Sequence, residues 1–260
     1  MKIVLCVKQV PDTSDIKWTP NNTIQREGLE SIINPYDVYA LESALSLKKE
    51  YKDICITALT MGPMQAKSML QRVIAVGADG AVLLSDRKFA GADTYSTGKT
   101  IARAIQSKLS DFNLVVCGQF AIDGDTAQTG PSIANFLNIP QITYVKKILS
   151  YEKNRIVVLR ELENYSEKVE VELPALVCVL KDNFEPSRAN IQGVIRSQKS
   201  EIPVYGLADI GLEVDEVGLK GSPTFVSKAF RAPKRDVECV FAADSLELAQ
   251  YIKKCGGADE

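Results

Sequence analysis

The chain has 260 residues, of which 45% are hydrophobic and 25% charged, and a formal net charge of −2; this composition indicates a globular protein and gives no sign of nucleic-acid binding. No apolar run reaches the roughly 20 residues of a membrane-spanning helix, so we expect no membrane span and a cytoplasmic location. The absence of histidine excludes Ser-His-Asp triads and His-ligated metals, and the six cysteines form no CxxC pair, so we expect no metal site.

Over the first 140 residues, short β-branched runs alternate with amphipathic stretches. A proline follows both Asn34 and Gly62 and marks two helix starts, because proline suits the first turn of a helix. The alternation predicts an α/β fold with a doubly wound, mostly parallel sheet that helices cover on both faces. The predicted strands are 2–10, 53–60, 81–84 and 114–117, and the predicted helices are 35–49, one that begins at Gly62-Pro63, 94–109 and 126–137.

The pattern changes after residue 141, where apolar runs joined by polar turns predict an antiparallel extension of the sheet. The continuous apolar run 174–180 predicts a buried central strand. Residues 206–233 contain glycines and prolines but little apolar periodicity, which predicts an extended linker. The antiparallel strands are predicted at 142–149, 155–162 and 168–173.

A last helix is predicted over 244–255, with Glu247 as a capping partner near its start. Leu246, Leu248 and Ile252 would form an apolar stripe on this helix, and such a stripe needs a partner surface. A linker that ends in an isolated helix is better explained as an arm that reaches another polypeptide than as a loop. The predicted parts are an α/β nucleotide-binding domain, 1–203, and a linker with a C-terminal arm, 204–260.

The strongest local signal is the segment 117–132, CGQFAIDGDTAQTGPS, which follows a predicted strand and leads into a helix. Its backbone N–H groups and hydroxyls at a helix N-terminus suit an anion such as phosphate. We expect Asp123 and Asp125 to face ribose hydroxyls or to cap the helix. An ordinary glycine-rich loop remains the alternative, because the segment is neither a Walker loop nor a GxGxxG fingerprint. The candidate ligand residues are Gly118, Asp123, Gly124, Asp125, Thr126, Gln128, Thr129, Gly130, Pro131 and Ser132.

Other segments would reach the same edge of a parallel sheet, where ligands bind outside the carboxyl ends of the strands. Lys8 could face a phosphate or a flavin carbonyl, and Met61 could pack on an aromatic ring. The ordinary alternatives are a solvated strand end for Lys8 and core filler for Met61. The candidates from these segments are Cys6, Val7, Lys8, Met61, Gly62 and Thr94.

A further region, 185–196, carries Ile191, Val194 and Ile195 among polar residues. Two interpretations are open for these apolar side chains. They belong either to an ordinary surface helix with its apolar face inward or to a patch that docks a partner.

Together these segments resemble the β subunit of electron transfer flavoprotein over nearly the whole chain. The resemblance implies an adenine-nucleotide-hydrolase-like α/β fold, a heterodimer with a larger α subunit, and an electron carrier with no catalytic side chain of its own. The arm would then pack on the α subunit. The segments that carry the resemblance are, in chain order, VLCVKQVPDT, NPYD, TMGP, AIDGDTAQTGPSIANFL, RELENYSEKVEVELPALVCV and EPSRANI.

By position, Cys6, Asn34, Met61 and the stretch 123–132 match the nucleotide contacts of the family. Ile191 matches an apolar anchor, often leucine in other members, that docks the partner dehydrogenase. The resemblance therefore adds Asn34 to the expected site and favours the docking interpretation of Ile191.

Members of the family bind either AMP or FAD in the β subunit. Gln9, Gly124 and the stretch FAGADTYSTGKT resemble the FAD-containing members, which bifurcate electrons; AMP-binding members often have a basic and an acidic residue at the first two positions. This likeness implies that NADH reduces the β-subunit flavin. One electron would then pass to ferredoxin or flavodoxin and the other, through the α-subunit flavin, to a flavin dehydrogenase of the acyl-CoA or lactate type. NADH oxidation would be an activity of the complex.

Two other functions stay open at this stage. One is a single-flavin carrier subunit that holds AMP as a structural ligand. The other is an ATP-binding hydrolase or a stress-type nucleotide-binding module of similar fold. The nucleotide extracted from the purified chain distinguishes all three.

Overall fold

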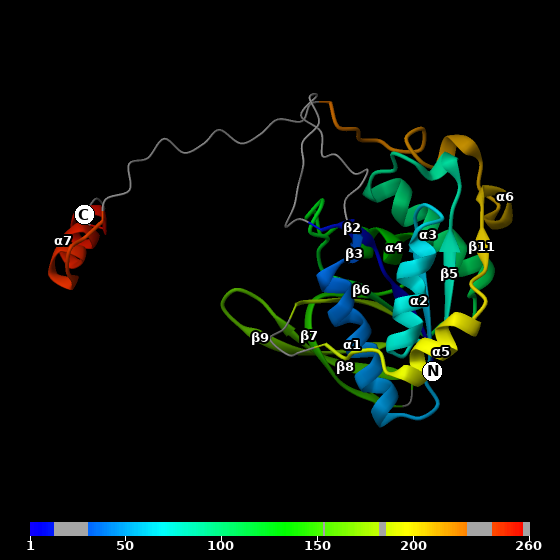
Figure 1. Ribbon diagram of the computed structural model, residues 1–260, viewed down its shortest axis with the longest axis horizontal. Coiled ribbons are helices and arrows are strands. Elements are labelled where there is room, and N and C mark those ends of the chain that lie inside the picture. The colour runs from blue at the N-terminus through cyan, green and yellow to red at the C-terminus, as the bar shows by residue number, and fades with distance from the viewer. Residues whose placement is uncertain (13–30, 153, 182–185, 228–240, 257–260) are drawn as a thin grey trace. The chain divides into compact units, whose positions relative to one another are not determined.

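The computed structural model describes residues 1–12, 31–152, 154–181, 186–227 and 241–256 (Figure 1). The chain divides into two compact units, Met1–Ser227 and Lys228–Glu260. The first unit contains the sheet with its covering helices, and the described part of the second contains one helix, α7 (Ser245–Gly256). Each unit is described by itself.

The first unit is built on a nine-stranded sheet with the order β11-β5-β4-β1-β6-β10-β7-β8-β9. From β11 to β7 each neighbouring pair is parallel, whereas β8 pairs antiparallel with β7 and β9 pairs antiparallel with β8. This arrangement confirms the predicted mostly parallel α/β sheet with an antiparallel extension. The strands are β1 (Lys2–Cys6), β4 (Cys55–Met61), β5 (Gly80–Leu84), β6 (Leu114–Gly118), β7 (Gln141–Glu152), β8 (Arg155–Glu161), β9 (Ser166–Glu172), β10 (Ala175–Val179) and β11 (Val204–Tyr205).

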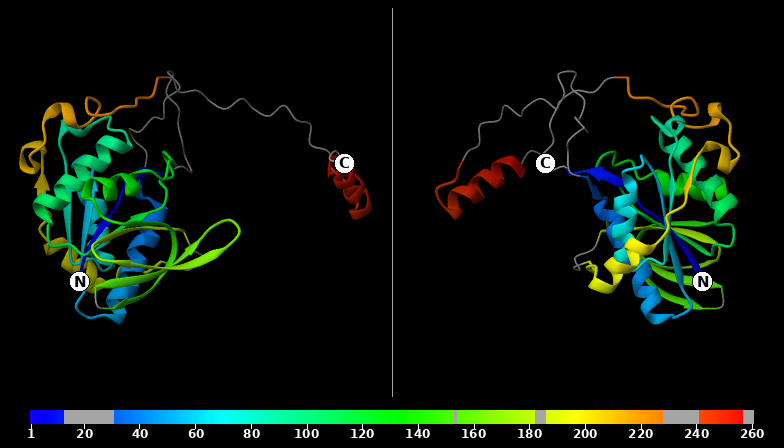
Figure 2. Two further views of the ribbon diagram at one scale, coloured as in Figure 1. Left: turned by 180° about the vertical axis from the view of Figure 1, so that it is seen from behind. Right: turned by 45° about the vertical axis from the view of Figure 1, so that its right-hand side comes forward.

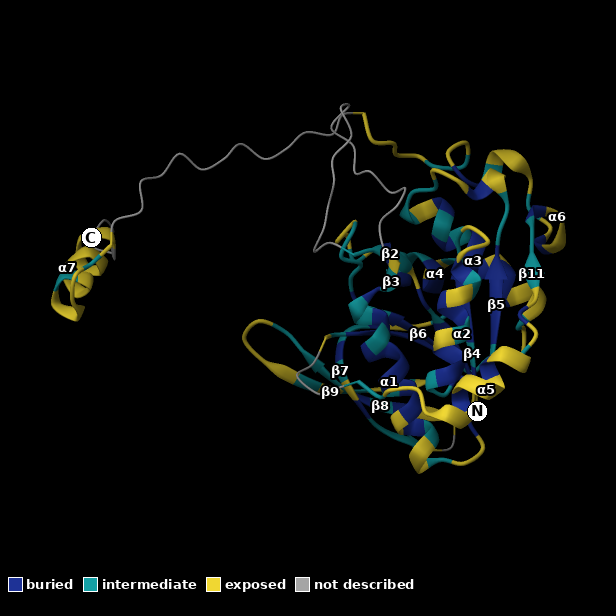
Figure 3. Cartoon of the chain, in the orientation of Figure 1, coloured by how far each residue is buried: buried dark blue, intermediate teal, exposed yellow. Residues whose placement is uncertain are grey.

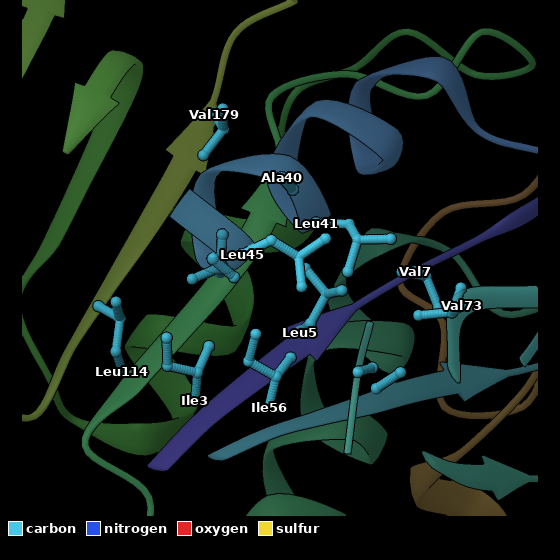
Figure 4. Close-up of a cluster of buried hydrophobic side chains, with 14 of the residues drawn as sticks. Ile3, Leu5, Val7, Ala40, Leu41, Leu45, Ile56, Val73, Leu114 and Val179 are labelled. Atoms are coloured by element: carbon cyan, nitrogen blue, oxygen red, sulfur yellow. The ribbon is translucent and has the colours of Figure 1, made fainter. Parts of the chain in front are cut away.

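Helices cover both faces of this sheet (Figure 2). Alternate residues of the parallel strands point to opposite faces, so each strand supplies two separate cores. Ile3 and Leu5 of β1 lie in the core under α1 and α2, as Figure 4 shows for the α1 side, and Val4 lies in the core under α3 and α4. Most residues of the parallel strands β1, β5, β6 and β10 are accordingly buried (Figure 3). The helices are α1 (Pro35–Glu50), α2 (Ala66–Val76), α3 (Thr94–Lys108), α4 (Thr129–Leu137), α5 (Ile191–Lys199) and α6 (Leu207–Ile210), with the short 3-10 helices η2 (Arg87–Phe89) and η3 (Val214–Glu216).

The predicted strand 2–10 is two strands, which corrects that prediction. β1 ends at Cys6, and β2 (Gln9–Pro11) pairs antiparallel with β3 (Ser31–Ile33) in a separate two-stranded sheet. The chain leaves the main sheet after Val7, whose N–H still donates to the carbonyl oxygen of Leu59 at 2.9 Å. Apolar residues lie on both sides of the break, from Ile3 to Val7 and again at Val10, so the sequence does not show it.

Two helices begin three or more residues later than predicted. The start of α2 is Ala66, because residues 63–65 form a turn in which the Ala66 N–H donates to the carbonyl oxygen of Pro63 at 2.9 Å. The start of α4 is Thr129, because Asp125 and Ala127 have positive φ angles of 50° and 56°, which no α-helix contains.

The segment expected as a linker from residue 206 is folded up to Ser227. Strand β11 joins the edge of the sheet beside β5, and the Leu207, Ile210 and Val217 side chains are buried in the core under α3. The compact unit therefore extends beyond the boundary expected at residue 203. The apolar residues of this segment are isolated between glycines and polar residues and follow neither a helical nor a strand period, so the sequence resembles that of a linker. The rest of the expected linker, 228–233, lies outside the described residues.

Helix α5 packs against α2. The Arg196 guanidinium donates to the carbonyl oxygens of Ile74 at 2.7 Å and of Ala78 at 3.2 Å, both at the end of α2. With α5 attached in this way, its apolar side chains face away from the core. The interpretation that the apolar face of this helix points inward is therefore wrong. The exposed apolar side chains are Ile191 (80% exposed), Val194 (44%) and Ile195 (51%).

Helix α7 begins as predicted. Asp244 accepts hydrogen bonds from the N–H groups of Leu246 and Glu247, both at 2.9 Å, and the Glu247 carboxylate accepts one from the Ala243 N–H at 2.7 Å. The predicted stripe of Leu246, Leu248 and Ile252 is exposed on this helix. None of the helices described here is both long and apolar enough to cross a membrane.

Candidate functional site

The order of strands reverses between β1 and β6. From β1 the chain adds β4 and β5 on one side of the sheet, and then crosses to add β6 on the other side. In doubly wound sheets the crevice at such a reversal, outside the carboxyl ends of the strands, is where ligands bind. Here those two carboxyl ends lead into Val7-Lys8 and Gly118-Gln119.

The buried carboxylate of Asp37 joins these two strand ends. It accepts hydrogen bonds from the Lys8 N–H at 2.7 Å and from the Gly118 N–H at 3.2 Å, one on each oxygen. Gly118 permits this approach, because a Cβ atom there would collide with Asp37 Oδ1 and with the backbone of Tyr36. Asp37 therefore fixes the separation of the two walls of the crevice.

Asn34, three residues earlier, ties the loop after β6 to the same point. Its side-chain amide donates to the carbonyl oxygen of Phe120 at 2.8 Å and accepts from the Ile122 N–H at 3.3 Å. Its backbone N–H donates to the carbonyl oxygen of Lys8 at 2.9 Å. Asn34 is buried, so it acts on the shape of the site through the loop.

Asp37 was not predicted as a site residue, although it lies in the segment NPYD. The available signal was a charged residue in the first turn of a helix whose buried side is apolar apart from Asp37 and Glu42. A buried carboxylate in such a position needs donors nearby, and the strand ends supply them.

Lys8 and Asp123, both predicted site residues, contact each other. The Lys8 ammonium donates to both oxygens of the Asp123 carboxylate, at 2.6 and 2.8 Å. The pair joins the end of β1 to the loop after β6. Asp123 was expected to face ribose or to cap a helix, and Lys8 to face a phosphate or a flavin carbonyl; in this structure each neutralises the other.

The rest of the predicted loop surrounds the N-terminus of α4. The Gly124 and Asp125 N–H groups donate to the carbonyl oxygen of Ala121, at 3.1 and 2.7 Å, which turns the loop toward the helix. Gly124, Asp125, Thr126 and Gln128 are exposed, and Thr129, Pro131 and Ser132 are partly exposed in the first turn of α4. Gly130 is buried there against Cys178 of β10.

The N-terminus of α3 lies beside this loop. The Thr94 hydroxyl donates to Gln128 Oε1 at 3.2 Å, which joins two predicted site residues from different segments. The Ser96 hydroxyl, one turn into α3, is fully buried and has no hydrogen-bond partner. Two helix N-termini therefore open onto the same edge of the sheet.

Met61 and Gly62 lie at the end of β4, on the other side of β1. Met61 packs partly against the core under α3 and α4, as does Cys6 at the end of β1, so both fit the core alternative for at least part of their surface. The Gly62 N–H donates to the carbonyl oxygen of Leu84 at 2.9 Å. These residues border the same edge of the sheet, and the Cys6 side chain is hydrogen-bonded to Cys117 of β6.

The edge offers exposed hydroxyls, helix N-termini and a neutralised ion pair, which suit a phosphate-bearing ligand. Among the residues that the structure describes, no group of three Cys, Asp or Glu side chains could hold a metal ion.

Asp37 predicts a pH dependence of stability. Burial raises the pKa of this carboxyl to about 7, against the lowering effect of the hydrogen bonds from Lys8, Asn34 and Gly118. The unfolded value is near 4, so the folded chain binds the proton more tightly, and the benefit is complete below pH 4 and lost as the pH rises through 7. We expect the free energy of unfolding to rise by about 1 kcal/mol from pH 8 to pH 6 in urea titrations.

The Asp37→Asn variant is the control, and it should show a flatter profile over this range. The chain has no histidine to titrate there. An equal pH dependence in both proteins would assign the effect to another group.

Comparison with known proteins identifies the family. The Electron transfer flavoprotein domain matches residues 21–209. The chain is 45% identical over 241 residues to "Electron transfer flavoprotein subunit beta" of Megasphaera elsdenii, an alignment that covers 90% of this chain and 89% of the relative. It is 43% identical over 236 residues to "Caffeyl-CoA reductase-Etf complex subunit CarD" of Acetobacterium woodii, with 90% and 89% covered. It is also 43% identical over 259 residues to "Acryloyl-CoA reductase electron transfer subunit gamma" of Anaerotignum propionicum, with 97% and 96% covered. The chain therefore belongs to the electron transfer flavoprotein family and is of the β-subunit type.

Proposed function

We propose that this chain is the small subunit of a heterodimeric electron transfer flavoprotein and that it binds FAD at the carboxyl edge of its sheet. The observation that carries the proposal is the position of the loop 118–132 at the reversal of strand order, between the N-termini of α3 and α4. The family membership favours this function over an ATP-binding hydrolase.

The residues at this edge fit the proposed ligand. A Cβ atom built on Gly124 has no neighbour within 4 Å, so the loop leaves room for close approach of a diphosphate. The Thr129 N–H and the hydroxyls of Thr129 and Ser132 would hold the phosphates at the start of α4, whereas the Ser132 N–H already donates to the carbonyl oxygen of Gln128 at 2.9 Å. Of the two carboxylates in this loop, Asp123 is paired with Lys8, which offsets its repulsion of the phosphates.

FAD would supply the electron-transfer chemistry when it is bound. The chain has no histidine and therefore no Ser-His or Cys-His pair of its own. The role of the residues is to position and enclose it. Asp37 and Asn34 set the width of the crevice, while Gln128 and Thr94 hold the loop against α3.

We propose further that NADH is the electron donor and that electrons are bifurcated between ferredoxin or flavodoxin and, through the α subunit, a flavin dehydrogenase. Gln9, Gly124 and the stretch 89–100 support the FAD-containing type over the AMP type. The names of the Acetobacterium and Anaerotignum relatives, which refer to CoA-linked reductases, support an acyl-CoA rather than a lactate dehydrogenase as partner.

Gly124 gives the most direct test of the ligand site. Gly124→Asp should weaken FAD binding by about tenfold or more, because it places a carboxylate beside a diphosphate. Gly124→Ala is the matched control: its methyl group meets no atom and should change the affinity little. The measurement is the dissociation constant of FAD for each purified variant. Equal affinities for the aspartate and alanine variants would place the diphosphate elsewhere.

Ile191 is proposed as the anchor for the partner dehydrogenase. It is 80% exposed on a helix that Arg196 fixes to α2, so it can enter a partner pocket without rearrangement. Ile191→Ala should cost about 1–3 kcal/mol of docking free energy and slow electron delivery to the dehydrogenase. Reduction of an artificial acceptor by NADH should stay nearly unchanged.

The neighbouring Gln192→Ala variant, also exposed, is the control and should affect neither assay. If Ile191→Ala lowers both activities to the same extent, Ile191 acts on the fold and not on docking.

The C-terminal arm is proposed to bind the α subunit through the exposed stripe of α7. Deletion of residues 230–260 should weaken assembly of the heterodimer at least tenfold while the thermal unfolding of the remaining unit persists, because that unit has its own two cores. Analytical ultracentrifugation with the α subunit measures the affinity. Wild-type affinity in the truncated chain would remove this role from the arm.

A further inference from the structure

Residues 214–226, which we call the strap, lie against the loop that precedes α3. The Leu219 N–H donates to the carbonyl oxygen of Ala90 at 3.0 Å. Gly218 adopts a φ angle of +57°, and a side chain there would collide with the carbonyl oxygen of Lys88. The strap therefore has one close-fitting position on this loop.

Asp93 connects the strap to α3 through both of its carboxylate oxygens. Oδ1 accepts from the Ser96 N–H at 2.9 Å and caps α3, while Oδ2 accepts from the Thr224 N–H at 3.1 Å and from the Thr224 hydroxyl at 2.7 Å. The Asp93 N–H donates in turn to Ser222 Oγ at 2.8 Å. Partial burial works to raise the pKa of Asp93, but the bonds from Ser96 and Thr224 hold it below its ordinary value, so the group stays ionised.

The residues that follow Asp93 and Thr224 in the chain belong to two different surfaces. Thr94, the residue after Asp93, donates to Gln128 of the nucleotide loop. Phe225 and Val226, the residues after Thr224, are 77% and 85% exposed and stand where the chain leaves the compact unit for the C-terminal arm. Asp93 thus connects the proposed ligand loop with the residues that precede the proposed partner-binding arm.

We propose that Asp93 couples these two sites, so that nucleotide binding and assembly with the α subunit favour each other. The inference rests on the proposed function. The strap has two states, one tied to Asp93 by Thr224 and one released. Release removes both donors from Oδ2, so that only the Ser96 N–H still stabilises the negative charge of Asp93. The phosphates of a bound nucleotide disfavour this released state, because they repel the less stabilised carboxylate beside the nucleotide loop. The α subunit, by burying Phe225 and Val226 on the tied strap, favours the same state, and linkage makes the effect mutual.

Asp93→Asn tests the coupling without removing the helix cap. Asparagine keeps one oxygen for the Ser96 N–H, but its NH₂ group cannot accept from Thr224. Thr224→Val, which removes only the hydroxyl donor, is a milder second variant. Asp86→Asn is the matched control, because Asp86 likewise caps η2 through the Lys88 N–H and binds the Leu207 N–H, but has no connection to Gln128.

The experiment measures hydrogen exchange of the peptide 218–226 in the full-length chain, with and without saturating FAD or AMP, whose binding is monitored separately. We expect nucleotide to slow this exchange severalfold in the wild type and in Asp86→Asn, less in Thr224→Val, and not in Asp93→Asn. In the heterodimer, the α subunit should tighten nucleotide binding about fivefold or more in the wild type, and Asp93→Asn should bring this ratio close to one.

Three results would overturn the coupling. If nucleotide binds but exchange of 218–226 is unchanged in the wild type, or if Asp93→Asn retains the full effect, the coupling is wrong and the proposed function stands. If neither FAD nor AMP binds the wild-type chain or its heterodimer, the nucleotide site itself is wrong and the coupling falls with it.

Discussion

The Asp37 carboxylate joins the ends of β1 and β6, the two strands between which the chain reverses the direction of sheet building. The two strands are paired neighbours, but the segments that follow them lead to helices on opposite faces of the sheet. A crevice opens between those segments, and its width has to be fixed. A buried carboxylate with one N–H donor on each oxygen does this. Burying the charged carboxylate costs free energy, as the raised pKa of Asp37 shows, and this cost is greatest above pH 7, where the group is ionised.

Other features of the site follow from this connection. With Lys8 held by its backbone N–H, its side chain reaches Asp123 and brings in the loop after β6. Asn34, one turn before Asp37, holds the same loop at Phe120. The loop in turn contacts α3 through Thr94, so the proposed ligand site is assembled from three segments that meet only because the first two strand ends are fixed.

Much of the fold was predictable because it depends on local pattern. The apolar runs of the strands, including β10, and the capping residues of α7 were all visible in the sequence. The loop proposed as a ligand site was chosen for its glycines, its hydroxyls and its place before a helix. What the sequence did not show depends on contacts between distant residues. The Lys8–Asp123 pair spans 115 positions, and the outward face of α5 depends on Arg196 binding the end of α2. The folded strap depends on Asp93, 131 positions from Thr224.

If this edge of the sheet holds FAD, the native heterodimer must release that FAD when it is denatured. The purified complex would be denatured and its nucleotides separated and quantified per chain. We expect one FAD for this subunit in addition to the flavin of the α subunit. AMP in place of that FAD would contradict the account in favour of a single-flavin carrier, and the absence of any nucleotide from this subunit would contradict the site itself.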